Sequence, residues 1–346
     1  ISMDTGLSSI RDRAAKFLEG TEPYGDGVGE VESLSVLADY AAHLTSLVPL
    51  QGERPLRIVV DAANGMAGLT VPAVFGEARG IEIIPMYFEL DGSFPNHEAN
   101  PLEPANLVDL QAAVLREHAD LGLAFDGDAD RCFVIDELGQ PVTPSAVAAM
   151  VAKREIIRVR NSGETGPIPV LHNLLCSRTV AEIIAENGGV PIRTRVGHSL
   201  IKDQMKKTGA IFGGEHSAHY YFAEFWGADN GMLAALHVIA EVRARTEALS
   251  TIGQEYSRYV ESGEINTTVK DQELVIAKIL DVFGSRGEQD SLDGLTMSGV
   301  APEGWWWLNV RGSNTEPLLR LNVEAETSSL MQSVRDEALA LIRATG

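Results

Sequence analysis

The sequence of 346 residues is poor in cysteine and has no long apolar run. Its two cysteines, Cys132 and Cys176, form no CxxC pair and are too few for a disulfide framework, which favours a reducing compartment. No apolar stretch approaches the roughly 18 residues of a membrane helix, and we expect no signal peptide. The expected location is therefore the cytoplasm, and no membrane partner is expected.

Basic residues are also scarce, with 28 lysines and arginines against 49 aspartates and glutamates and a formal charge of −21. A field of this sign repels nucleic acids and anionic membranes, so no nucleic-acid partner is expected. A small anionic substrate remains compatible with it, provided that its site is locally basic or holds a metal ion.

Apolar runs of strand length alternate with longer helical patterns along the first part of the chain. Strands are expected at residues 56–63, 81–87 and 120–125, with a helix at 104–117. This alternation is the βαβ pattern of a mainly parallel sheet that helices cover.

The same theme then restarts, and a different one closes the chain. Helices are expected at 145–159, 179–187, 199–207 and 229–245, with strands at 168–172 and 191–196. The last part has a helix at 273–283, strands at 305–310 and 318–324, and a final helix from Ser328. The prediction is an α/β chain of two consecutive mixed-sheet domains, residues 1–138 and 139–252, followed by a smaller α+β domain, 253–346.

The stretch FDGDADRCFVI, residues 125–135, places Asp126, Asp128 and Asp130 at alternate positions beside a buried strand. Gly127 allows a tight turn there, and three carboxylates held together repel one another unless a cation lies among them. All-oxygen ligands favour a hard divalent ion such as Mg²⁺. A solvated acidic turn is the alternative. The stretch does not match an EF-hand calcium loop, because Arg131 stands where that loop requires glycine.

The stretch VGHSLIKDQM, residues 196–205, lies at a strand-to-helix junction. His198 there can titrate near neutral pH, Ser199 is a candidate helix cap, and Lys202 lies early in the helix. The alternative is an ordinary capped helix with a surface lysine.

The stretch GGEHSAHYYF, residues 213–222, gathers Glu215, His216, Ser217 and His219. Such a cluster can bind zinc, but its spacing fits no HExxH motif. A carboxylate and a hydroxyl on a glycine-rich backbone also suit the hydroxyls of a sugar. A polar loop that enters a strand is the third possibility.

The stretch RGSNTEPLLRLNVEAE begins at Arg311. Arginine offers a planar fork of donors, and the turn that follows adds Ser313, Asn314 and Thr315. Backbone and side-chain donors gathered in this way predict an anion site, with an ordinary turn between strands as the alternative.

Together, the four stretches resemble the α-D-phosphohexomutase family and follow its order: metal-binding loop, a loop beside the active site, sugar-binding loop and phosphate-binding loop. DGSFPNHEANPLEPANL, residues 91–107, also resembles the family's second domain. Within the family, the sugar loop looks most like that of bacterial phosphomannomutases.

The resemblance implies a role for each residue. The implied ligands of Mg²⁺ are Asp126, Asp128 and Asp130. The implied sugar-binding residues, for the O3 and O4 hydroxyls, are Glu215 and Ser217. The implied ligands of the non-reacting phosphate are Arg311, Ser313, Asn314 and Thr315. The implied catalytic residues are Arg131 near the transferring phosphate and, as candidates for proton transfer or substrate contact, His198, Lys202 and His219.

The implied reaction interconverts mannose 6-phosphate and mannose 1-phosphate through a phosphoserine and a hexose 1,6-bisphosphate, which is intermediate and activator. The family's T-x-S-H-N-P motif, which carries that serine, does not occur in this sequence. We therefore expect the chain alone to be inactive, with the family's N-terminal domain or a second copy as a partner.

Several alternatives stay open at this stage. The alternative activity most similar to phosphomannomutase is that of a phosphoglucomutase or a dual-specificity enzyme, because glucose and mannose differ only at C2. A non-catalytic sugar-phosphate binding protein is the alternative of another class. A haloacid-dehalogenase-like phosphatase would need a DxDxT/V motif, but residues 56–65, LRIVVDAANG, hold one aspartate. Two departures from the family are Leu175, where some members have lysine, and Ala218, where glycine is usual.

Overall fold

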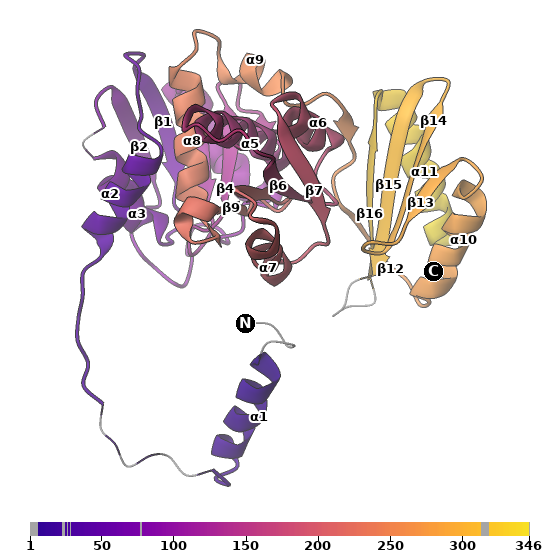
Figure 1. Ribbon diagram of the computed structural model, residues 1–346, viewed down its shortest axis with the longest axis horizontal. Helices are drawn as coiled ribbons and strands as arrows, with labels where there is room; N and C mark the ends of the chain where they lie inside the picture. The colour runs from indigo at the N-terminus through magenta and orange to yellow at the C-terminus, as the bar shows by residue number, and fades with distance from the viewer. Residues whose placement is uncertain are drawn as a thin grey trace.

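The computed structural model describes residues 6–22, 25, 27, 29–76, 78–312 and 318–345, except for the side chains of His198, Ser199 and Thr345. The described strands form three sheets (Figure 1). The first two are mixed and the third is antiparallel. The predicted architecture of two mixed α/β units and a smaller α+β unit is confirmed.

The first sheet has the strand order β2-β1-β3-β4-β5. Its strands are β1 (Leu56–Asp61), β2 (Ile81–Met86), β3 (Leu121–Phe125), β4 (Cys132–Asp136) and β5 (Pro141–Val142). β1, β2 and β3 are parallel, whereas β4 and β5 run antiparallel to their neighbours. β3 and β4 are buried throughout, which explains their nearly unbroken apolar sequence.

The helices of the first unit lie between and beside these strands. They are α2 (Leu37–Leu47), α3 (Ala67–Phe75), the 3₁₀ helix η2 (Pro104–Leu107) and α4 (Val108–Glu117). The single helix expected at 104–117 is therefore a 3₁₀ turn followed by an α-helix.

The second sheet has the order β10-β9-β8-β6-β7. Its strands are β6 (Ile168–Asn173), β7 (Gly189–Thr194), β8 (Phe212–Gly214), β9 (Tyr220–Phe222) and β10 (Ala228–Asp229). The helices around it are α5 (Pro144–Asn161), α6 (Arg178–Glu186), α7 (His198–Thr208), η3 (Ala223–Phe225), α8 (Gly231–Arg243) and α9 (Leu249–Gln254). α5 begins with Pro144 behind the capping hydroxyl of Thr143, and α8 begins behind the capping amide of Asn230.

The first two units share one apolar core. It runs without a break from Val59 and Leu123 of the first sheet, through Val151 of α5 and Leu236 of α8, to Val170 of the second sheet. A shared core of this kind holds the loops of the two sheets in a defined relative position.

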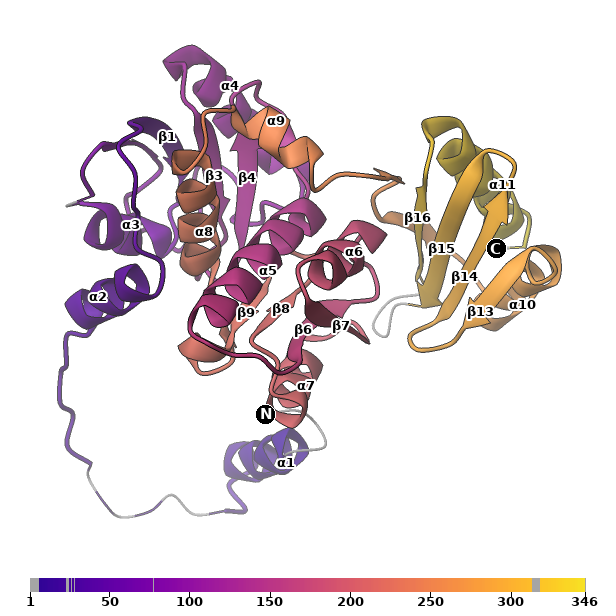
Figure 2. The same cartoon turned by 45° about the horizontal axis from the view of Figure 1, so that its top comes forward.

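The third sheet is built from β11 (Val260–Glu261), β12 (Ile265–Thr268), β13 (Gly287–Asp290), β14 (Leu295–Ala301), β15 (Gly304–Gly312) and β16 (Leu318–Ala325). α10 (Gln272–Phe283) and α11 (Ser328–Thr345) cover one of its faces and enclose a separate apolar core (Figure 2). The other face meets the second unit through polar contacts, including the bond from the backbone N–H of Arg178 to Glu324 Oε2, 3.1 Å.

The first helix, α1 (Leu7–Leu18), stands apart from the three sheets in both views (Figures 1 and 2), and none of its residues is buried. Across the described part of the chain, every helix is too short or too polar to cross a bilayer. The boundaries expected near residues 138 and 252 stay predictions.

Candidate active site

The three-aspartate loop connects β3 to β4. Asp126 directly follows the buried strand and is itself buried, while Asp128 is exposed and Asp130 lies between these extremes. A left-handed residue, Ala129 with φ 61°, turns the loop back, and its N–H donates to the carbonyl of Asp126 at 3.2 Å. One carboxylate oxygen from each aspartate lies within 4.8 Å of the other two. This all-oxygen donor set fits Mg²⁺.

Electrostatics within the loop favour a cation. Burial, together with repulsion from Asp126, Asp128 and Asp229, raises the pKa of Asp130 to about 7. Asp126 is oriented by Arg131, whose N–H donates to Oδ1 at 3.1 Å and whose Nε donates to Oδ2 at 2.7 Å. Arg131 therefore contacts a predicted metal ligand directly.

The metal loop is joined to the second unit at two points. Arg131 and His219 form an isolated antiparallel backbone bridge, so the metal loop and the sugar loop lie side by side. Gly231, the first residue of α8, lies so close to the loop that a Cβ there would be 2.7 Å from the carbonyl of Arg131. These contacts place two loops from different sheets around one point.

Glu215 in the sugar loop is held by three donors. Its side chain is 3% exposed. Tyr221 Oη donates to Oε2 at 2.8 Å, and weaker contacts from Asn173 Nδ2 at 3.4 Å and the Gly197 N–H at 3.5 Å reach Oε1. A carboxylate supported in this way keeps a fixed orientation. Ala218 adopts φ 66°, which explains why glycine suits this position.

His219 stands where the two loops meet. Its Nδ1 is 2.9 Å from Ser217 Oγ and 3.6 Å from Glu215 Oε2, and its Nε2 is 3.7 Å from Asp130 Oδ1. The imidazole thus lies between a predicted sugar ligand and a predicted metal ligand, where it can exchange a proton with either side.

Lys202 on α7 lies beside the same group. Its Nζ is 2.8 Å from Asp229 Oδ1, and Asp229 forms a second cluster of possible metal ligands with Asp130 and His219. The side chain of His198 lies outside the described residues. The side chain of Ser199, the candidate cap, also lies outside the described residues, and Gly197 occupies the N-cap position of α7.

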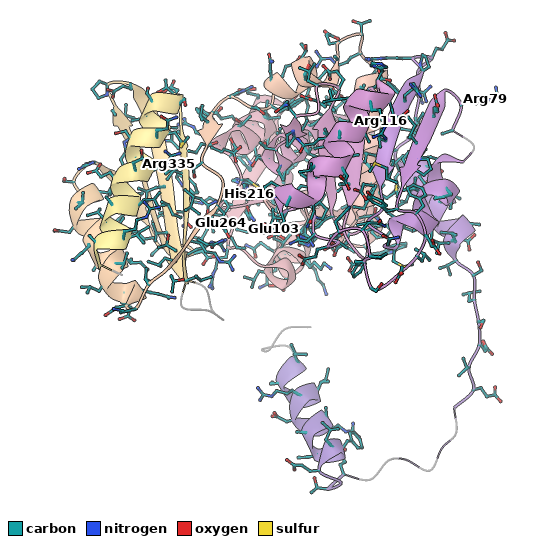
Figure 3. The ribbon with its side chains drawn as sticks, turned by 180° about the vertical axis from the view of Figure 1, so that it is seen from behind. Arg79, Glu103, Arg116, His216, Glu264 and Arg335 are labelled. Atoms are coloured by element: carbon teal, nitrogen blue, oxygen red, sulfur yellow. The ribbon has the colours of Figure 1, made fainter. Side chains whose placement is uncertain are left out.

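The phosphate loop is described only at its edges. Arg311 lies near the end of β15, and its NH2 donates to Glu264 Oε2 at 2.6 Å. Ser313, Asn314 and Thr315 lie outside the described residues. The charges of this pair act on His216 of the sugar loop. Its pKa is lowered by burial, raised by Glu264 and lowered by Arg311. Figure 3 shows His216 and Glu264 at the boundary between the third unit and the rest of the chain.

Four side chains of the site were not predicted from the sequence: Asn173, Tyr221, Asp229 and Glu264. Tyr221 was read only as part of a strand, although its position two residues after His219 places both side chains on one face. Asn173 also accepts hydrogen bonds from the backbone of Leu175 and Cys176, so it joins two turns. Leu175, at the position of the family's lysine, is buried and supplies no charge.

Each of the three units matches a separate domain profile of one protein family. Profiles described as "Phosphoglucomutase/phosphomannomutase" match as alpha/beta/alpha domain II over residues 38–139, alpha/beta/alpha domain III over 143–259 and C-terminal domain over 264–341.

Individual relatives agree with these profiles. A "Phosphomannomutase/phosphoglucomutase" of Pseudomonas aeruginosa is 35% identical over 333 residues, covering 95% of this chain and 68% of that protein. "Phosphohexose mutases" of Xanthomonas campestris are 35% identical over 343 residues, covering 98% and 73%. The crystal structure of a phosphoglucomutase/phosphomannomutase family protein from Burkholderia thailandensis superposes with a TM-score of 0.82 at 28% identity, covering 97% of this chain and 70% of that one.

Proposed function

Because the chain belongs to the phosphoglucomutase/phosphomannomutase family, we propose that it forms the metal-, sugar- and phosphate-binding part of a phosphomannomutase. The reaction interconverts mannose 6-phosphate and mannose 1-phosphate through a phosphoserine and a hexose 1,6-bisphosphate. That serine has to come from outside these 346 residues, because they hold no T-x-S-H-N-P motif.

The observation that carries this proposal is the backbone bridge between Arg131 and His219. It brings a three-carboxylate loop against a loop whose glutamate and serine suit sugar hydroxyls. A protein that only captured a sugar phosphate would not need three aspartates beside the sugar site. This juxtaposition favours phosphoryl transfer over the non-catalytic reading.

Each residue has a task in this scheme. Asp126, Asp128 and Asp130 hold Mg²⁺, which withdraws charge from the transferring phosphoryl group when it is bound. Arg131 orients Asp126 and faces the same phosphate. Glu215 and Ser217 bind the O3 and O4 hydroxyls of the hexose, which are the same in glucose and mannose.

Proton transfer falls to His219 in this proposal. The hydroxyl that attacks phosphorus must lose its proton, and the imidazole lies between the sugar ligands and the metal loop. Lys202 and His198 remain candidates for contact with the substrate. Arg311, with Ser313, Asn314 and Thr315, holds the phosphate that does not react.

One phosphate pocket then serves both orientations of the bisphosphate. After the first transfer, the intermediate turns over so that its other phosphate faces the serine. The hydroxyls at O3 and O4 are read again after this turn by the same Glu215 and Ser217. This requirement is compatible with Arg311 in the third unit and Glu215 and Ser217 in the second.

Calorimetric titration of the 346-residue chain tests the proposal. We expect mannose 1-phosphate and mannose 6-phosphate to compete for one site, and Mg²⁺ to strengthen the binding of mannose 1,6-bisphosphate. Asp128→Asn should abolish the effect of Mg²⁺ without abolishing binding of the monophosphates.

Three outcomes would contradict this scheme. If Mg²⁺ had no effect on the bisphosphate, the non-catalytic binding reading would replace it. If glucose 1-phosphate bound about tenfold tighter than mannose 1-phosphate, phosphoglucomutase would be the better assignment. The chain alone should show no interconversion by phosphorus NMR, and full turnover without another domain would refute the need for an external serine.

A further inference from the structure

The loop that follows β2, residues 87–100, has no task in the scheme above, although it contacts the metal loop at two points. A Cβ on Gly127 would lie 3.4 Å from the ring of Phe94 and 3.7 Å from the Cβ of Ala99. Asn100 Oδ1 accepts a hydrogen bond from Arg131 Nη1 at 3.4 Å. This covering loop therefore touches both the turn of the metal loop and the arginine that ends it.

The turn that follows β1 reaches the same part of the metal loop. The N–H of Met66 donates to the carbonyl of Gly127 at 2.9 Å, and a Cβ on Gly65 would lie 2.6 Å from that oxygen. The loops after the parallel strands β1, β2 and β3 thus pack on one another, at the edge of an open α/β sheet where ligands bind.

Asn64 joins the turn after β1 to the covering loop. Its N–H donates to the carbonyl of Tyr87 at 2.8 Å, and its carbonyl accepts from the N–H of Asp91 at 3.0 Å. Its side-chain Nδ2 donates to the carbonyl of Glu89 at 2.8 Å, and its Oδ1 accepts from Asn96 Nδ2 at 2.8 Å. Both backbone groups and both side-chain groups of this buried residue are therefore bonded to the covering loop.

A shielded ion pair makes a second connection. Asp61, the last residue of β1, has a side chain that is 1% exposed, and its Oδ2 lies 2.9 Å from His97 Nε2. His97 Nδ1 lies 2.9 Å from the carbonyl of Glu98. A neutral imidazole carries one N–H, so both bonds form together only when the ring is protonated. Burial lowers the pKa of His97, but the bond to Glu98 and the charge of Asp61 outweigh it and raise the pKa.

The backbone of these loops is held in unfavourable conformations. Eight non-glycine residues have positive φ in the part of the chain that the structure describes. Five of them lie here: Ala63, Asn64, Tyr87, Phe94 and Ala129. Such conformations persist where the surrounding contacts impose them. Contacts between the loops, rather than local preference, therefore set the shape of the metal loop.

We propose that the covering loop is a clamp on the metal loop and that Asn64 and His97 are positioning residues, which hold Gly127 and Arg131 in the geometry that divalent-ion binding requires. The inference rests on the proposed function, since it takes the three aspartates of the metal loop as ligands. Asn64 and His97 act through Phe94 and Asn100 of the covering loop. Metal sites tolerate only about 0.5 Å of misplacement, so a loosened clamp weakens ion binding.

Two single substitutions in the full chain loosen the clamp at different points. Asn64→Gly removes the side-chain bonds and keeps a residue that accepts the φ of 60°. His97→Leu removes both ring donors. In each variant the Kd for Mn²⁺, measured by water-proton relaxation, should rise about tenfold or more. The Kd for mannose 1-phosphate should change by less than about twofold, because the sugar and phosphate loops belong to the second and third units.

One variant should restore binding and another should leave it unchanged. His97→Gln keeps an amide that can donate to Asp61, so its Mn²⁺ affinity should lie between those of the wild type and His97→Leu. Asp120→Asn is the matched control, because Asp120 also accepts a backbone N–H, from Arg57 at 2.8 Å, and a bond from Arg54 at 3.4 Å. It lies at the opposite end of β1 and β3, so its Kd for Mn²⁺ should stay within about twofold of wild type.

Amide hydrogen exchange in the metal-free chain reports on the clamp without the ion. The N–H groups of Ala129 and Arg131 both donate to Asp126, to its carbonyl and its carboxylate respectively. In Asn64→Gly and His97→Leu these amides should exchange about tenfold faster or more than in the wild type and in Asp120→Asn.

Unchanged Mn²⁺ affinity in either clamp variant overturns the inference. Equal losses of Mn²⁺ and mannose 1-phosphate binding also overturn it, because the two residues would then support the whole chain rather than the metal loop. If the wild-type chain binds no Mn²⁺, the metal site of the proposed function fails and hydrogen exchange decides about the clamp. Faster exchange of the metal loop in both variants then supports the clamp, and unchanged exchange overturns it.

Discussion

A single methyl group added to α8 should disable the metal loop of the neighbouring unit. Gly231 opens this helix, and a Cβ built there would lie 2.7 Å from both the carbonyl carbon and oxygen of Arg131 and 3.0 Å from the carbonyl oxygen of Ala129. All three atoms belong to the backbone of the metal loop, so no flexible side chain can yield. Gly231→Ala must therefore push the loop or the helix aside.

The size of this displacement follows from the contact distances. Ordinary contacts begin at 3.4 Å, so the loop has to retreat by about 0.7 Å. Metal and catalytic sites tolerate only about 0.5 Å of misplacement, and about 1 Å costs on the order of 100-fold. We therefore expect divalent-ion affinity to fall by about tenfold or more.

Stability should respond much less than ion binding. Alanine is intrinsically better than glycine in a helix by about 1 kcal/mol. Overpacking costs about 1–3 kcal/mol, so the free energy of unfolding should fall by roughly 0–2 kcal/mol in total. The chain should remain folded at room temperature while its metal loop is distorted.

The assay is a titration with Mn²⁺, a paramagnetic substitute for Mg²⁺, followed by water-proton relaxation. Gly253→Ala in α9 is the matched control, because a Cβ there would meet only Val142 Cγ1, at 3.9 Å. Unchanged Mn²⁺ affinity in Gly231→Ala would refute the reasoning that α8 positions the loop. An equal loss in both variants would refute it as well.

Three further predictions concern the carboxylates. Tyr221→Phe removes the hydroxyl that donates to Glu215 at 2.8 Å, so affinity for mannose 1-phosphate should fall about tenfold. Affinity for a 3,4-dideoxy analogue should stay constant. Equal losses for both ligands would contradict this. Because burial raises the pKa of Asp130 to about 7, a divalent ion must displace its proton. Mn²⁺ affinity should therefore fall up to about tenfold from pH 7 to pH 6. Asp130→Asn should make Mn²⁺ affinity depend less on pH. Burial, with repulsion from Glu324, raises the pKa of Glu261 to about 8. The native state then holds a proton that the unfolded chain has already lost, so stability should fall as pH rises from about 4.5 to 8. Thermal unfolding should show a shallower pH slope in Glu261→Gln, and identical slopes would count against this reasoning.

Local sequence patterns were sufficient to predict helices and strands and to identify the metal loop. Strands such as β1 and β3 and helices such as α10 follow from apolar runs and from helical periodicity, both of which act over a few residues. Asp126, Asp128 and Asp130 lie within five residues of one another, so any tight turn between two strands brings their carboxylates together. The order of the four loops was enough to indicate the family, which the comparisons confirm.

Contacts between distant parts of the chain needed the tertiary structure. The bridge from Arg131 to His219 joins two sheets, and it exists because α5 and α8 pack both sheets into one core. Tyr221 contacts Glu215 because β8 and β9 pair antiparallel with Tyr221 opposite Gly213, and Glu215 follows two residues after Gly213. No local pattern encodes the close contact of Gly231 with the metal loop, because that contact depends on how the first unit packs against α8.

The amino-acid sequence by itself determined which segments form strands and helices and which loops carry carboxylates, hydroxyls and arginines. Only the tertiary structure decided which of those loops meet and what holds their side chains. Glu264 illustrates the difference, because in the sequence it is one acidic residue among 49, and in the folded chain it lies between Arg311 and Arg320. The physical reason is that secondary structure depends on neighbours in the chain, whereas the charges and donors around a site depend on the register of strands and the packing of whole units.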